Sequence, residues 1–143
     1  MKKIFLLAVA FLTMQFSFAQ ASAEAKTYIK NLGIKESLEM SKKDISDLIL
    51  PENLTNFSNE FDTVSSQFIS TFENLFHESF TIEDLKRMNS SIENNTAIDP
   101  IMPKDLESFQ EKAIKAEEEM GLTIEGIVMK YGDPVKLQQM QQE

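Results

Sequence analysis

The side chains best suited to acid–base chemistry lie around the chain's single histidine. His77 occurs in the stretch FHESFTIEDLKRM, four residues after Glu73 and directly before Glu78, with Glu83 and Asp84 further on. A histidine beside carboxylates can act as a general acid or base where the fold restricts water and tunes its pKa. The same stretch also fits the end of one helix, a turn and the start of the next. The elements around it decide between these two interpretations.

Apolar spacing favours the helix boundary. Between residues 57 and 80 apolar side chains recur mostly every three or four residues, which is typical of a helix with one buried face. This stripe consists of Phe57, Phe61, Val64, Phe68, Phe72, Leu75, Phe76 and Phe80. His77 lies about 160° from its middle on a helical wheel, so an exposed histidine paired with Glu73 is predicted. Thr81 suits the next N-cap, because Asp84 falls in the first turn that follows.

The rest of the chain after residue 20 is also predicted to be helical. Inward positions are expected at Leu85, Met88 and Ile92, at Leu106, Phe109, Ala113, Ala116 and Met120 after Pro103, and at Tyr28, Ile29, Leu32, Leu38, Ile45, Leu48 and Ile49 in two short helices. Gly33 separates these two, since glycine tolerates the positive φ of a helix end. The segment TIEGIVMKY has strand-like composition, but a lone strand leaves its edges unpaired. We therefore predict helix up to Tyr131, a turn at residues 132–134 and a frayed polar end.

Residues 1–19 have the layout of a secretory signal peptide. Lys2 and Lys3 precede an apolar run, and the small residues Ser17 and Ala19 close it. This order of charge, apolar run and small residues is typical of cleaved export signals, whereas a membrane helix needs roughly 20 apolar residues. Cleavage after Ala19, or alternatively after Ala23, leaves a soluble periplasmic or secreted protein. Residues 20–143 are predicted to form one all-α domain, a small bundle of about five helices.

Composition narrows the function classes. The net charge is −9 and there is no basic cluster, which opposes binding to nucleic acid. The chain has no cysteine and one histidine, so disulfides and zinc sites with several His or Cys ligands are excluded. It contains neither a DxDxDG-type calcium loop nor a Gly-x-Ser-x-Gly turn. No catalytic, cofactor-binding or metal-ligating residue is therefore assigned, and no cofactor is expected.

The stretch FTIEDLKRMNSSIENNTA, residues 80–97, resembles the exported helical proteins grouped as domain of unknown function 2059. That family's pattern is Phe-Thr, then an acidic residue and Leu, then an aromatic pair and Ser-Pro-x-Gly. The residues that match in register are Phe80, Thr81, Asp84 and Leu85. The residues that depart from the pattern are Ser91 and Ile92 at the aromatic pair, and Asn94, Asn95 and Ala97 at Ser-Pro and Gly. Because the order of elements is also similar, the resemblance implies a compact helical envelope protein without established catalytic residues.

Two classes of function stay open. The first is a non-enzymatic interaction or binding module of the bacterial envelope, which holds a protein or small ligand in a groove between amphipathic helices or on an acidic face. The alternative is a carboxylate-based enzyme around Glu73, His77 and Glu78, or a cation-binding protein. A pocket with two titratable groups of strongly shifted pKa would favour the enzyme.

Overall fold

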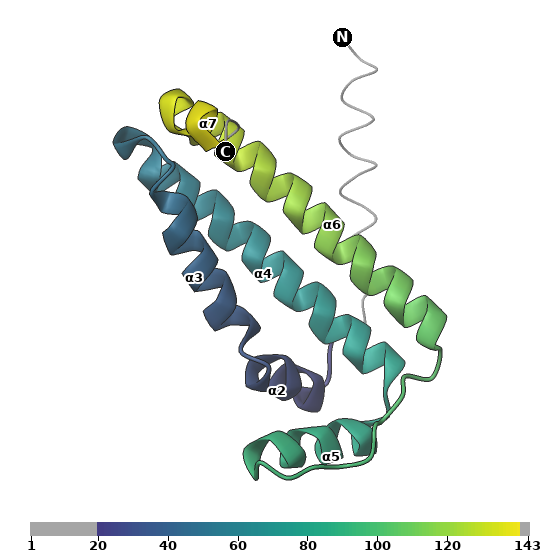
Figure 1. Cartoon of the computed structure of the whole chain (residues 1–143). Helices are drawn as coiled ribbons and strands as arrows, with labels where there is room; N and C mark the ends of the chain where they lie inside the picture. Colours follow the sequence, from purple (N-terminus) through teal and green to yellow (C-terminus); the bar gives the residue numbers. More distant parts are fainter. Residues whose placement is uncertain (1–19, 141–143) are drawn as a thin grey trace.

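The computed structural model describes residues 20–140 and confirms the predicted all-α fold (Figure 1). Its elements are α2 (Ala23–Asn31), α3 (Ile34–Ser46), the 3₁₀ turn η1 (Pro51–Asn53), α4 (Leu54–Ser79), α5 (Ile82–Glu93), α6 (Leu106–Tyr131) and α7 (Pro134–Met140). The predicted signal peptide, residues 1–19, lies outside the described residues. Within residues 20–140 no helix is both long and apolar enough to cross a membrane.

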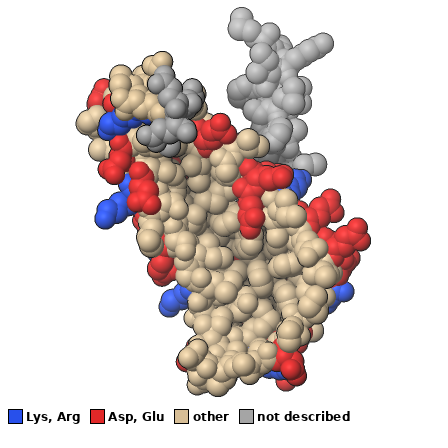
Figure 2. All heavy atoms as spheres, in the orientation of Figure 1, with Lys and Arg blue, Asp and Glu red and all other residues tan. Residues whose placement is uncertain are grey.

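The long helices α4 and α6 lie antiparallel and side by side, with α4 in the middle of the bundle and α6 along one side of it (Figure 1). α3 packs along the other side of α4, while α2 packs against the C-terminal half of α4 and also contacts α5. Figure 2 shows one face of the molecule, with its charged side chains gathered along the edges. The surface over α2 and over the C-terminal half of α4 shows no charged side chain on this face. The bundle thus presents a face whose middle is uncharged.

Three clusters of buried side chains make up the core. Phe57 and Phe61 are 0% and 1% exposed and pack with Ile49 and Ile127 at one end of the α4–α6 pair. The middle cluster consists of Ile29, Phe72 and Ala116. The cluster at the other end consists of Ala21, Ala25, Phe80, Leu85 and Met88. The phenylalanine stripe is therefore structural, as its spacing predicts.

The boundary between α4 and α5 is a reciprocal capping box. The Asp84 amide donates to Thr81 Oγ1 at 3.1 Å, and the Thr81 amide donates to Asp84 Oδ2 at 3.4 Å. The Thr81 hydroxyl donates to the same carboxylate oxygen at 2.6 Å and lowers the pKa of Asp84. Two otherwise free backbone groups gain partners, which confirms the predicted helix start.

Two further features hold α2 in place. Gly33 follows α2 with φ +69°, so the predicted glycine at this helix end is confirmed. Asn89 of α5 is 7% exposed and makes hydrogen bonds to two groups of α2. Its Nδ2 donates to the Glu24 carbonyl at 3.0 Å, and its Oδ1 accepts from Asn31 Nδ2 at 3.1 Å. A buried side-chain amide thus fixes α5 against α2.

Polar contacts join the N-terminal part of α4 to the C-terminal end of α6. Glu60 Oε1 of α4 lies 2.6 Å from both Lys130 Nζ and the Tyr131 hydroxyl of α6. These two donors, Lys130 first, lower the pKa of the Glu60 carboxyl. Nearby, the Leu50 amide donates to the Tyr131 carbonyl at 3.1 Å, and Ile49 forms an isolated antiparallel bridge with the residue after Tyr131. The connection before α4 is therefore fixed to the end of α6.

Three residues predicted to face inward are exposed instead. Leu32, Ile92 and Leu106 are 45%, 40% and 41% exposed. Leu32 is the C-cap of α2, where the chain leaves the helical path. Ile92 lies in the last turn of α5 and Leu106 at the first position of α6. Helical periodicity assigns a face to such terminal residues, but the partner helix need not extend far enough to cover them.

The C-terminal segment predicted to fray forms α7 as far as the structure describes it. Helix α6 ends at Tyr131, as predicted, and Pro134 occupies the first position of α7. Asp133 Oδ1 accepts a hydrogen bond from the Val135 amide at 2.9 Å, while Lys136 Nζ donates to the Asp47 carbonyl at 2.7 Å. These two hydrogen bonds support the start of α7 and join it to the residue that follows α3.

Candidate functional site

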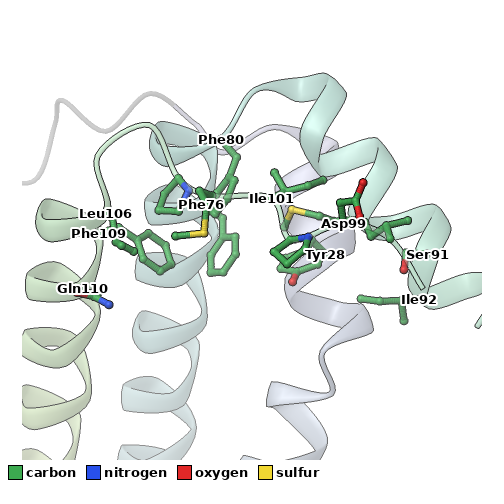
Figure 3. A pocket seen from close by; sticks show the side chains of 15 residues that line it. Tyr28, Phe76, Phe80, Ser91, Ile92, Asp99, Ile101, Leu106, Phe109 and Gln110 are labelled. Atoms are coloured by element: carbon green, nitrogen blue, oxygen red, sulfur yellow. The ribbon is translucent and has the colours of Figure 1, made fainter. Parts of the chain in front are cut away.

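A cavity of about 460 Å³ lies where α2, α4, α5 and α6 meet the loop of residues 94–105 (Figure 3). Most of its 15 lining side chains are aromatic or aliphatic. The principal apolar lining residues are Tyr28, Phe76, Phe80, Met88, Ile101 and Phe109. A volume of this size, with predominantly apolar walls, is typical of small-molecule sites.

The aromatic side of the cavity is built from three helices. Phe76 of α4 lies at its centre, with ring centroids 5.0 Å from Tyr28, 5.3 Å from Phe80 and 5.2 Å from Phe109. Figure 3 shows Tyr28 projecting from α2 and Phe109 from α6 toward these two rings of α4. The Phe76–Phe109 contact is edge to face, a favourable arrangement for aromatic quadrupoles. The wall is therefore held by packing among its own members.

The loop of residues 94–105 supplies the opposite wall. Pro100 and Pro103 disfavour helix here. Ile98 before the first proline, and Ile101 and Met102 between the two prolines, line the cavity. The loop is held at both ends. Ser91 donates its hydroxyl hydrogen to the Thr96 carbonyl, and the Lys104 amide donates to the Ser79 carbonyl at 2.8 Å. These bonds hold apolar loop side chains against the helices.

Only two titratable side chains line the cavity, Tyr28 and Asp99. Burial raises the pKa of the Tyr28 hydroxyl, so it stays protonated at neutral pH and can serve as a neutral hydrogen-bonding group. Ser91 and Gln110 add two more neutral polar groups. Tyr28, Ser91, Asp99 and Gln110 are thus the polar side chains of the lining that could orient a bound molecule.

The histidine predicted to be exposed is partly buried. His77 Nδ1 is inaccessible to solvent and has no hydrogen-bond partner in residues 20–140, and no ion pair joins His77 to Glu73 there. The predicted surface pair is therefore wrong. Helices α2, α3 and α6 all pack against α4, so more of its circumference is covered than a one-face helix pattern assumes.

The three residues of the alternative enzyme hypothesis are not brought to one cavity. Glu78 lines a hollow of about 260 Å³ between α4 and α6, where its Oε2 lies 3.2 Å from Lys112 Nζ. Glu73 lines a different hollow of about 320 Å³, shared with Lys26 and Lys30 of α2. None of the three lines the aromatic cavity. Across the described chain, no group of three or more His, Asp or Glu residues is arranged to hold a metal ion.

The sequence analysis did not predict the cavity, because its aromatic lining residues also fit the buried faces of helices. Helical spacing assigns Phe76, Phe80 and Phe109 to buried helix faces, and it gives no position to Ile98 or Ile101, which lie outside any helix. The available signal was the segment AIDPIMP, where apolar residues alternate with prolines between two helices. Such a segment places apolar side chains on a loop rather than on a helix face.

Comparison of the chain with known proteins finds no matching family model, no matching curated protein and no matching solved structure.

Proposed function

We propose that this protein is an exported, non-enzymatic binding module of the bacterial envelope that holds a small apolar molecule in the aromatic cavity. The observation that carries this proposal is the cavity of about 460 Å³ with its wall of interlocking aromatic rings. Burial of an apolar ligand against such a wall is favourable at about 25 cal/mol per Å² of area removed from water. Twelve of the 15 lining residues are aromatic, aliphatic, methionine or proline, so binding of an apolar molecule is the activity that this lining supports.

Export is the part of the proposal supported by the sequence of residues 1–19 alone. The basic start, apolar run and small residues at Ser17 and Ala19 are those of a cleaved signal. Intact-mass measurement of protein recovered outside the cytoplasm should give an N-terminus at Gln20, whereas full-length chain in the inner membrane would contradict export. Membership of domain of unknown function 2059 is likewise a proposal, supported by Phe80, Thr81, Asp84 and Leu85.

A tryptophan reporter tests the binding site directly, because the chain contains no tryptophan. Leu106 lines the cavity and is 41% exposed, so Leu106→Trp places an indole at the cavity without removing a core residue. Leu122 lies on the same helix, is 70% exposed and does not line the cavity, which makes Leu122→Trp the matched control. The neutral fluorescent probe N-phenyl-1-naphthylamine should quench the indole fluorescence of the Leu106→Trp protein by energy transfer in a saturable titration.

The response of the control should be much weaker. Helix α6 rises about 1.5 Å per residue, so the two reporters are separated along it by roughly 24 Å, over which energy transfer falls steeply. Equal quenching of the two tryptophans, or a response that never saturates, would show that the probe binds nonspecifically. Absence of any response from a folded Leu106→Trp protein would likewise contradict an apolar binding site.

A further inference from the structure

The cavity lining has an acidic side chain but no basic one. Asp99 is the only acidic residue of the lining, and the lining contains no Lys, Arg or His. Figure 3 shows Asp99 and Ser91 at the side of the cavity next to α5, whereas Leu106 and Phe109 lie at the opposite side on α6. The cavity therefore has an apolar end and an end with a carboxylate.

Two basic residues close in sequence to the cavity wall, Lys104 and Lys112, make contacts outside it, and Arg87, which precedes the lining residue Met88, does not itself line the cavity. Lys104 follows the lining residue Pro103, but its Nζ donates to the Glu78 carbonyl at 3.2 Å, at the C-terminal end of α4. Lys112, one turn beyond the lining part of α6, has its Nζ 3.2 Å from the Glu78 carboxylate. These contacts direct both ammonium groups toward Glu78, which is outside the cavity lining.

The aromatic wall and the charge of the whole chain act on different parts of a ligand. The rings of Tyr28, Phe76, Phe80 and Phe109 pack against one another and offer apolar surface to the body of the ligand. The chain as a whole has a net charge of −9, so its field also attracts cations and repels anions. An anionic head group at the Asp99 end of the cavity would meet a side chain of the same formal charge and no basic side chain of the lining.

We propose that the ligand of this cavity is a small amphiphile with a positively charged amine or quaternary ammonium group. Its cation lies toward Asp99, and its apolar body lies against Phe76, Phe80 and Phe109. This proposal rests on the proposed binding function and specifies the class of ligand.

Isothermal titration calorimetry of the purified protein with three decyl compounds tests this ligand class. Decyltrimethylammonium, decanoate and decanol share the same tail and differ in the charge of the head group. We expect decyltrimethylammonium to bind at least ~10-fold more tightly than decanoate, with decanol between them. Asp99→Asn should reduce the ratio of the two dissociation constants to about threefold, because the net negative charge of the chain still favours the cation. Glu117→Gln, an exposed change on α6 outside the lining, should leave the ratio unchanged.

Each contrary outcome has a distinct meaning. If decanoate binds as tightly as the ammonium compound while decanol also binds, the cationic ligand class is overturned and the apolar binding function stands. If Asp99→Asn keeps the full ratio, or Glu117→Gln lowers it equally, the assignment of Asp99 is overturned. If none of the three compounds binds to folded protein, both this inference and the proposed function are wrong.

Discussion

Replacing Phe57 by alanine should be among the most damaging single changes in the bundle. The Phe57 side chain is 0% exposed, its ring centroid lies 5.6 Å from that of Phe61, and it packs with Ile49 and Ile127. Truncation removes the buried ring and leaves a cavity that the surrounding helices can only partly close. Phe→Ala changes at such sites lower the free energy of unfolding by about 3–5 kcal/mol. Because domains of this size are stable by only about 5–15 kcal/mol, the loss is a large part of the total.

Urea titration followed by circular dichroism measures this loss. Thr63→Ala is the control on the same helix, since Thr63 is exposed and its hydroxyl bonds only to the Asn59 carbonyl of the preceding turn. Its effect should stay within about 0.5 kcal/mol. Phe57→Leu retains most of the apolar volume and should cost about 1.5 kcal/mol or less, which gives a measurable value if the alanine variant fails to fold. Equal and small changes for Phe57→Ala and Thr63→Ala, with unchanged m values, would refute the assignment of this cluster as core.

Three further predictions concern single contacts. Thr81→Ala should lower the free energy of unfolding by about 1 kcal/mol through loss of the N-cap. Because the folded protein lowers the pKa of Asp84, the stabilisation from that carboxylate is present above the unfolded pKa of about 3.9 and is lost as pH falls through the folded pKa. Denaturation at a series of acidic pH values should therefore show a smaller loss for Thr81→Ala than for the parent. Asn89→Leu should cost about 1–3 kcal/mol in thermal unfolding, because two polar partners on α2 lose their hydrogen bonds; no change would mean that water replaces the amide. Gly33→Ala, at φ +69°, should destabilise by about 1–2 kcal/mol, whereas Gly126→Ala, with open space around its Cβ, should stabilise by about 0.5–1 kcal/mol; the same sign for both would contradict the backbone argument.

The sequence by itself determined most helices and the main core face. Apolar spacing identified helices α4 and α6, because helix geometry depends on neighbours three and four residues away. The start of α5 at Thr81 was predictable from residue types, since Thr81 and Asp84 suit an N-cap and a first turn. Gly33 was predictable for the same reason, since its positive φ is a local requirement of the helix end. Periodicity was less informative for Leu32 and Ile92, which lie where their helices end and partner helices need not reach.

Only the tertiary structure decided the candidate site and the environment of His77. The cavity brings together Tyr28 of α2, Phe76 of α4 and Phe109 of α6, which are far apart in the sequence. Its opposite wall is the loop of residues 94–105, whose path no periodic pattern predicts. The burial of His77 Nδ1 likewise depends on how many helices surround α4. The spacing of apolar residues predicts which face of a helix is apolar. It does not predict which elements pack against that face, because such contacts join residues far apart in the chain and depend on how whole helices pack.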